Sequence, residues 1–203
     1  MKALIIVDIQ NDFLPGGALA VKDGDQIIPL VNRLQRKFEL IVATQDWHPN
    51  DHGSFASNHN RLVGEKIQLA GLDQILWPDH CVQETMGADF AQKLNTKKID
   101  KVFRKGTDKT IDSYSGFFDN GHRKSTGLEG YLKEKRATEV HIVGLATDYC
   151  VKFTALDAVS LGFKTIVILP ACRGVDLKPG DVNAAIEEMQ KKGVYIIKEV
   201  QNV

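Results

Sequence analysis

Short apolar stretches alternate along the chain with segments in which apolar residues recur every three or four positions. The first pattern is typical of buried strands, and the second is typical of amphipathic helices. Strands are therefore predicted over residues 3–7, 40–44, 101–103, 140–143, 165–169 and 194–197. Helices are predicted over residues 25–38, 87–94, 127–135, 148–161 and 179–192.

This alternation of strand and helix indicates an α/β fold. The strands are rich in β-branched residues and nearly continuous in apolar character, which favours a parallel sheet covered on both faces. We predict a single doubly wound domain over residues 1–203, with a mostly parallel six-stranded sheet and helices on both faces. The stretch 46–84 stands apart because it is long and irregular, and it holds four of the six histidines. A loop of this length in a compact domain is usually functional.

Polar side chains follow four of the predicted strands where each strand ends. Asp8 follows the first strand, Asp46 and His48 follow the second, Lys105 follows the third, and Cys150 follows the fourth. Ligands of open parallel sheets bind at the carboxyl ends of the strands. One shared site explains these residues better than four separate structural roles.

Cys150 is the candidate nucleophile. It lies just beyond the apolar run 140–145, near the predicted start of a helix, where the positive helix end lowers the pKa of a thiol. Asp8 would serve as its base and Lys105 as the charge that holds the pair, the usual logic of an activated thiol. The alternatives are a small buried Cys150, an Asp8 that caps a loop, and a solvated Lys105.

Asp46, His48 and His80 are candidate metal ligands, with His52 as a further candidate. Asp46 and His48 are two positions apart, so their side chains point to the same side of an extended chain. Two imidazoles and a carboxylate suit Zn²⁺, Fe²⁺ or Mn²⁺ and leave positions open for water or substrate. The alternative is a set of loop histidines hydrogen-bonded to the backbone.

Composition narrows the class of protein. The 26 basic and 26 acidic residues cancel, so nothing suggests nucleic acid or a membrane surface as a partner, and self-association is left open. The apolar run 3–7 is too short for a signal peptide or a membrane span. Three cysteines are an odd, sparse set that suits a reducing compartment, so we expect a cytoplasmic protein.

Six segments resemble the nicotinamidase/pyrazinamidase family of isochorismatase-like cysteine hydrolases, and they occur in that family's order over nearly the whole chain. They are Asp8-Ile9-Gln10-Asn11-Asp12-Phe13, Asp46-Trp47-His48-Pro49, Trp77-Pro78-Asp79-His80-Cys81, Phe103-Arg104-Lys105-Gly106, Asp112-Ser113-Tyr114-Ser115, and Gly144-Leu145-Ala146-Thr147-Asp148-Tyr149-Cys150-Val151. The resemblance implies hydrolysis of nicotinamide to nicotinate and ammonia, with pyrazinamide as a further substrate.

The resemblance also implies a role for each matched residue. Cys150 is the nucleophile, Asp8 the proton shuttle and Lys105 the stabilising charge. A cis Leu145–Ala146 bond aims the N–H groups of Ala146 and Cys150 into an oxyanion hole. The metal ligands are Asp46, His48 and His80, with His52 either direct or acting through water, around one divalent ion for which Zn²⁺ is the first choice. The residues that would line the ring pocket are Phe13, Leu19, Trp77, Tyr114, Ala146 and Tyr149.

Three rival functions remain at this stage. A related cysteine hydrolase could act on another small amide, such as an N-carbamoyl compound, which has no ring to coordinate. An isochorismatase-type vinyl-ether hydrolase is disfavoured because it needs no thiol at Cys150. A metal- or redox-sensing binding module could use the same metal ligands and Cys150 without catalysis.

Overall fold

A parallel sheet of six strands forms the centre of the computed structural model, which describes residues 1–199 and 201. Its spatial order is β5-β2-β1-β6-β7-β8, and every neighbouring pair is parallel. The strands are β1 (Lys2–Val7), β2 (Leu40–Asp46), β5 (Lys101–Lys105), β6 (Glu139–Leu145), β7 (Lys164–Arg173) and β8 (Tyr195–Ile197). The predicted six-stranded sheet is confirmed. The chain winds outward from β1 in both directions, so a crevice opens at the carboxyl ends of the central strands.

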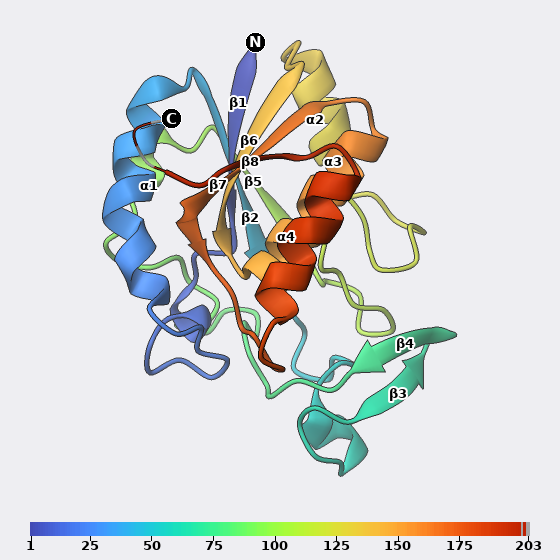
Figure 1. Ribbon diagram of the computed structural model, residues 1–203. Coiled ribbons are helices and arrows are strands. Elements are labelled where there is room, and N and C mark those ends of the chain that lie inside the picture. The colour runs from blue at the N-terminus through green and yellow to red at the C-terminus, as the bar shows by residue number, and fades with distance from the viewer. Residues whose placement is uncertain (200, 202–203) are drawn as a thin grey trace.

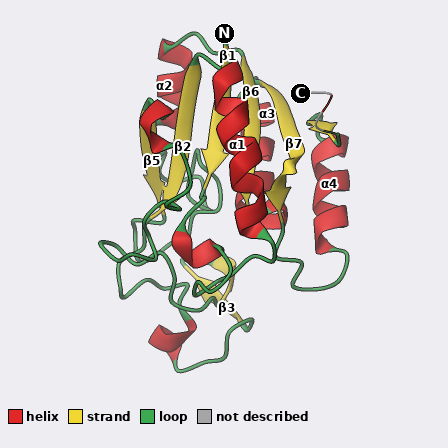
Figure 2. Cartoon of the chain, turned by 90° about the vertical axis from the view of Figure 1, so that its left-hand side faces the viewer, coloured by secondary structure: helices red, strands yellow, loops and turns green. Residues whose placement is uncertain are grey.

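Helices cover both faces of this sheet, as predicted. They are α1 (Ile28–Leu34), α2 (Leu128–Glu134), α3 (Lys152–Ser160) and α4 (Asp181–Lys191). Helix α1 lies on one face, and the other three helices lie on the opposite face (Figures 1 and 2). Two apolar clusters, one on each face, include the inward side chains of these helices. Within the described residues, no helix is both long and apolar enough to cross a membrane.

The helix predicted over 87–94 is wrong, because this segment is a series of turns. Its apolar residues Ala88, Ala91 and Leu94 are buried as an amphipathic helix would bury them. Its backbone pairs with the segment after β1 instead, since Asp12 N donates to Gly87 O and Ala91 N donates to Ile9 O. The spacing of the apolar residues could not show whether the backbone hydrogen bonds form within a helix or with the segment after β1.

Two other predicted helices are shorter than expected. The segment predicted over 25–38 is divided into a 3₁₀ turn (Gly24–Ile27), α1 and a second 3₁₀ turn (Gln35–Lys37). The segment predicted over 148–161 begins as a π-helical turn (Thr147–Val151), and α3 follows it. Cys150 therefore lies in a π-helical turn rather than in the first turn of an α-helix.

The irregular stretch 46–84 contains a hairpin that the sequence did not predict. Strands β3 (Lys66–Leu69) and β4 (Leu72–Ile75) pair antiparallel, apart from the central sheet and beyond the carboxyl ends of its strands (Figure 1). The two connecting residues, Ala70 and Gly71, both have positive φ, at 52° and 80°. Asn-Gly and Asp-Gly are the usual signals for such a turn, and an alanine at its first position gives no such signal.

An ion cluster centred on Glu139 lies at the amino ends of the central strands. Its carboxylate is 2.9 Å from Lys164 Nζ, 2.7 Å from His141 Nε2 and 3.4 Å from Lys2 Nζ. Hydrogen bonds from Lys164 and His141 lower the pKa of Glu139 to about 2. This lowered pKa means that the folded state favours the charged carboxylate. The resulting stability is present above the ordinary pKa of glutamate and is lost as the pH falls towards 2.

We therefore expect Glu139→Gln to lower the free energy of unfolding at pH 7, with the deficit shrinking between about pH 4.5 and pH 2. Urea denaturation of both proteins across this range measures the deficit. Glu129→Gln is the matched control because Glu129 pairs with Lys133 on the surface of α2, where an ion pair contributes little. A deficit that persists unchanged at pH 2 would contradict the role of the charge.

Candidate active site

The carboxyl ends of four strands of the central sheet bring Asp8, Asp46, Lys105 and Cys150 together, as predicted. Lys105 Nζ is 2.9 Å from Asp8 Oδ2, 3.0 Å from Asp46 Oδ1 and 3.4 Å from Cys150 Sγ. Its ammonium also donates to Ser113 O at 2.9 Å. All four side chains are buried, and Lys105 is only 2% exposed. The alternative of a solvated Lys105 is excluded by this burial.

Charge explains why Lys105 remains an ammonium. Burial alone would lower its pKa, but Asp46 and Asp8 outweigh burial and raise the pKa of Lys105 well above its usual range. Burial disfavours the charged form of Asp8 too, and this raises its pKa. The positive charge of Lys105 opposes the rise, and the negative charge of Asp46 adds to it. Thr44 Oγ1 donates to the other Asp8 oxygen at 2.6 Å. Asp8 is thus a carboxylate with more affinity for a proton than usual.

The expectation that Cys150 has a lowered pKa is wrong. Burial raises the pKa of the Cys150 thiol well above its ordinary value; Lys105 offsets part of this shift, and Asp8 and Asp46 add to it. The helix start was expected to stabilise a thiolate, but desolvation dominates at this buried position. The resting group is therefore a thiol, and it needs a base at the moment of attack.

The turn that carries Cys150 is held at both ends. Tyr149 N and Val151 N both donate to Ala146 O, at 3.1 and 3.0 Å. The Asp148 carboxylate accepts N–H groups from Val175 and Asp176, which lie beyond β7. The Leu145–Ala146 peptide bond is cis, as the resemblance implied.

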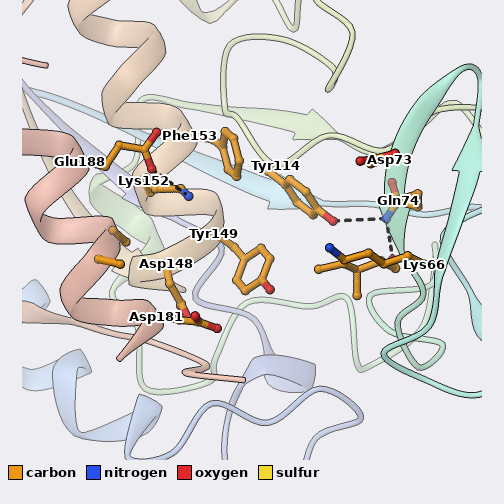
Figure 3. A pocket seen from close by; sticks show the side chains of 13 residues that line it. Lys66, Asp73, Gln74, Tyr114, Asp148, Tyr149, Lys152, Phe153, Asp181 and Glu188 are labelled. Atoms are coloured by element: carbon orange, nitrogen blue, oxygen red, sulfur yellow. Dashed lines mark hydrogen bonds and ion pairs between the residues drawn. The ribbon is translucent and has the colours of Figure 1, made fainter. Parts of the chain in front are cut away.

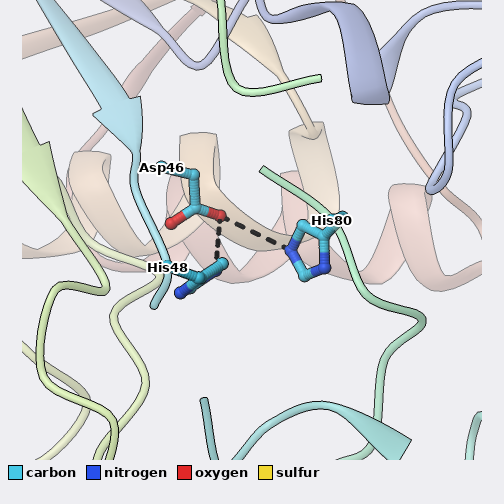
Figure 4. Close-up of side chains that lie close together, drawn as sticks. All are labelled: Asp46, His48 and His80. Carbon is cyan, nitrogen blue, oxygen red and sulfur yellow. Dashed lines mark ion pairs between the residues drawn. The ribbon is translucent and has the colours of Figure 1, made fainter. Parts of the chain in front are cut away.

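Asp46, His48 and His80 converge on one another beside this cluster (Figure 4). Asp46 Oδ2 is 3.2 Å from His48 Nε2 and 3.6 Å from His80 Nε2. The other ring nitrogens are engaged by the backbone, His48 Nδ1 with Gly106 O at 2.9 Å and His80 Nδ1 with Pro78 O at 2.7 Å. Such outer contacts orient both Nε2 atoms towards Asp46, as in metal-binding histidines.

Three features of this group fit a divalent cation. The donor set is two imidazole nitrogens and a carboxylate oxygen, all buried and within 4.8 Å of one another. His48 Nε2 has no hydrogen-bond partner within the described part of the chain. Gly106 has φ +63° and lies so close that a Cβ there would be 2.3 Å from His48 Cε1. Glycine at 106 therefore leaves room for the imidazole of His48.

His52 lies next to His48, with ring centroids 4.2 Å apart. His52, His48 and Asp112 form a second group whose ligand atoms lie within 4.8 Å of one another. His52 Nδ1 contacts Ser54 Oγ at 2.7 Å, and its Nε2 is among the buried atoms without a partner in the described residues. Burial, reinforced by the charge of His48, lowers the pKa of His52 to about 4. Its imidazole is therefore neutral near pH 7.

A pocket lies directly over Cys150 and beside His80. Edge-to-face contacts join Tyr149 to Trp77 at 5.0 Å and to Tyr114 at 5.5 Å between ring centroids. The structure places all six residues expected around a ring on this pocket, and adds Asp112 and Val175, which the sequence did not single out. The lining residues are Phe13, Leu19, Asp46, Trp77, His80, Asp112, Tyr114, Ala146, Tyr149, Cys150 and Val175.

Comparison with known proteins gives concordant matches. The isochorismatase domain family matches residues 2–200. The Escherichia coli nicotinamidase is 50% identical over 199 residues, covering 96% of this chain and 93% of that protein. A nicotinamidase/pyrazinamidase structure from Acinetobacter baumanii has a TM-score of 0.96 at 49% identity, covering 100% of this chain and 98% of that one. The Pyrococcus horikoshii pyrazinamidase, solved in complex with zinc, has a TM-score of 0.80 at 40% identity, covering 98% and 99%.

Proposed function

The chain belongs to the isochorismatase family, and from this premise we propose that it is a nicotinamidase, which hydrolyses nicotinamide to nicotinate and ammonia and also deamidates pyrazinamide. The observation that carries the proposal is the position of Cys150. Its Sγ is 3.4 Å from Lys105 Nζ, which in turn is 2.9 Å from Asp8, at an aromatic pocket beside His80. Relatives that are about half identical over most of the chain support an amidase.

In the proposed mechanism, Asp8 takes the thiol proton while Cys150 Sγ attacks the carboxamide carbon. Its raised pKa makes Asp8 a stronger base than an ordinary carboxylate. Backbone N–H groups of Ala146 and Cys150 would hold the oxyanion, a contribution of about 3–4 kcal/mol for one donor in other enzymes. Asp8 then returns its proton to the departing nitrogen, which leaves as ammonia and a thioester remains. Water then attacks the thioester while Asp8 takes one of its protons. The C–S bond breaks, nicotinate leaves, and Asp8 passes the proton to the departing sulfur, which restores the Cys150 thiol.

Asp46, His48 and His80 would hold a divalent cation, which we propose to be Zn²⁺. When bound, the ion supplies a template that fixes the pyridine nitrogen and thus the orientation of the ring. The donor set supports this proposal, as does the zinc in the Pyrococcus horikoshii pyrazinamidase structure. We propose that His52 would contact the ion either directly or through a water molecule, which its unpartnered Nε2 within the described chain supports.

The extent and location of the enzyme are also proposed. One catalytic domain over residues 1–203 is supported by the family match to residues 2–200. A cytoplasmic location is supported by Cys81, Cys150 and Cys172, which are all free and buried. Thiols kept in this form suit a reducing compartment.

The proposed function is tested by release of ammonia from the purified protein with nicotinamide, pyrazinamide and an N-carbamoyl compound as alternative substrates. We expect nicotinamide and pyrazinamide to be hydrolysed and the N-carbamoyl compound to be a much poorer substrate, because it has no flat ring for the aromatic pocket. Preference for the N-carbamoyl compound would favour the related amidase. Absence of ammonia release from all three would favour the binding module.

Removing the metal should weaken substrate binding more than it affects the thiol. Chelation or His48→Ala should remove one divalent ion per chain. KM for nicotinamide should rise at least ~10-fold, since even mutation of a group that supports a ligand often lowers metal affinity or activity 10–100-fold. Alkylation of Cys150 should change much less, because its thiol contacts Lys105 and Asp8 directly. Metal content, KM and iodoacetamide labelling are measured together.

His59→Ala is the matched control for the metal prediction. His59 lies in the same long loop, but its Nε2 contacts Gly53 O at 2.8 Å and it belongs to neither group of candidate ligands. The control should keep its ion. If His48→Ala loses its ion and Cys150 labelling stops as well, the proposed division of roles between the metal and Lys105 is wrong.

A further inference from the structure

The β3–β4 hairpin contributes one buried side chain, Gln74. Among the residues of these two strands, the others are exposed or half-buried, whereas Gln74 is only 3% exposed. The hairpin lies apart from the central sheet (Figure 1), and Gln74 points from it towards Tyr114 in the cavity drawn in Figure 3. A buried carboxamide is costly unless it is hydrogen-bonded, so its partners indicate what it does.

The Gln74 carboxamide presents its NH₂ group to three acceptors. Nε2 lies 2.7 Å from Ile75 O and 2.9 Å from Asp112 Oδ2. It also lies 3.2 Å from the Tyr114 hydroxyl, a contact that Figure 3 draws. A backbone carbonyl and a carboxylate can only accept, which fixes the nitrogen of the carboxamide on this side. An NH₂ group has two hydrogens for these three acceptors, so the 3.2 Å contact with Tyr114, the longest, shares a hydrogen with a shorter one. An amide nitrogen does not accept, so Gln74 cannot take the hydroxyl hydrogen of Tyr114 through this contact.

Tyr114 receives a second donor on its hydroxyl. Trp77 Nε1 lies 3.1 Å from the same oxygen, and an indole N–H can only donate. Neither Gln74 nor Trp77 can accept the hydroxyl hydrogen of Tyr114. That hydrogen is available to another acceptor.

The cavities show which side of Tyr114 Gln74 supports. Tyr114 and Tyr149 line both the pocket over Cys150 and a larger outer cavity of ≈ 350 Å³. Gln74 lines the outer cavity but not the pocket over Cys150. It therefore braces the tyrosine from the side away from Cys150 and acts through Tyr114 without lining the inner pocket itself.

We propose that Gln74 is a positioning residue: its carboxamide holds the Tyr114 hydroxyl so that the O–H is presented as a hydrogen-bond donor to an aromatic carboxamide in the pocket over Cys150. The proposal rests on the proposed function. The hairpin contributes no residue to the lining of the pocket over Cys150, so under this proposal it acts on that pocket only through Tyr114.

The experiment compares Gln74→Met and Gln74→Glu with Gln68→Met. Methionine keeps the length of the side chain without its hydrogen bonds, and glutamate has a similar shape but accepts the hydroxyl hydrogen instead of donating to the oxygen. Gln68 is the matched control because it lies on the same hairpin and is exposed. We expect KM for nicotinamide to rise about 5–10-fold in Gln74→Met, as for loss of one hydrogen bond, with kcat within about threefold. Gln74→Glu should raise KM at least as much.

A double-mutant cycle tests whether Gln74 acts through Tyr114. In a Tyr114→Phe background, Gln74→Met should change KM by less than about twofold, because the hydroxyl it positions is gone. Tyr114→Phe alone should raise KM by a factor similar to that of Gln74→Met, which keeps the test available if Gln74→Met does not fold. Additive effects, or an unchanged KM in Tyr114→Phe, would overturn the proposal.

The wild-type assay separates this proposal from the proposed function. If the wild type does not hydrolyse nicotinamide, the proposed function fails and the role of Gln74 fails with it. If the wild type hydrolyses nicotinamide and Gln74→Met has the same KM as Gln68→Met, only the role of Gln74 is overturned.

Discussion

Replacement of Cys150 by alanine is expected to lower the rate of ammonia release from nicotinamide by at least about 10⁴-fold, since removal of a covalent nucleophile can cost on the order of 10⁶-fold. No other cysteine thiol lies within the described residues that line the pocket beside His80. The fold should survive, because the substitution removes a single sulfur atom from a buried position. Ammonia release and circular dichroism of the purified variant measure the two outcomes.

Cys172→Ala is the control for this substitution. Cys172 is also free and buried, its burial raises its pKa to about 12, and its Sγ contacts Ile168 O at 3.4 Å, away from the pocket. It should keep most of the activity. Activity of Cys150→Ala within tenfold of the wild type would exclude covalent catalysis by Cys150.

The convergence of the charged groups could be predicted from the sequence because parallel topology determines it. Once apolar runs 3–7, 40–44 and 101–103 are assigned to one parallel sheet, Asp8, Asp46 and Lys105 must lie along its carboxyl edge. The neighbouring positions of β1, β2 and β5 bring them into contact. His80 could not be placed in the same way. It follows no strand of the central sheet, so residue type and the matching motif, rather than topology, indicated its role.

The electrostatics of the site could not be predicted from residue order. A helix start beside a lysine suggested a low pKa for Cys150, but the extent of burial decides the direction and raises it. The pocket over Cys150, which is 7% exposed, is lined by segments far away in the sequence, including Tyr114 and Trp77. Sequence spacing contains no signal for that packing.

The role of Gln74 was also beyond sequence analysis, for a different physical reason. Its strand is short, and its hairpin turn lacks the residues that usually mark such a turn. A glutamine in a stretch read as irregular is normally solvated. Its burial and its contacts with Asp112 and Tyr114 distinguish it from Gln68, its exposed neighbour in the hairpin.

Lys105→Met should destabilise the fold as well as the active site. Lys105 neutralises two buried carboxylates, Asp8 at 2.9 Å and Asp46 at 3.0 Å, and removal of one member of a buried ion pair typically costs ~3–5 kcal/mol. Chemical denaturation measures this loss, and the assays below require conditions in which the variant remains folded. Asp8→Asn should cost less, because burial already raises the pKa of Asp8 and disfavours its charge.

Asp8→Asn and Lys105→Met should shift the reactivity of Cys150 in opposite directions while both abolish most turnover. The negative charge of Asp8 raises the pKa of the Cys150 thiol, and the positive charge of Lys105 lowers it. Asp8→Asn should therefore lower that pKa and keep or increase the alkylation rate at neutral pH, since the rate follows the thiolate fraction. Lys105→Met should raise that pKa further and slow alkylation.

Turnover should fall in both variants, for different reasons. Asparagine at position 8 cannot take the thiol proton, return it to the leaving nitrogen or take one from water, so ammonia release should fall by the ~10²–10⁴-fold typical of general acid–base catalysis. In Lys105→Met the thiolate itself is disfavoured, so alkylation and turnover should fall together. A pH series of iodoacetamide labelling and of ammonia release for both variants separates the two effects. Asparagine at position 8 cannot take a proton, so near-normal turnover by Asp8→Asn would mean that another base serves Cys150. The role proposed for Asp8 at the end of β1 would then be wrong.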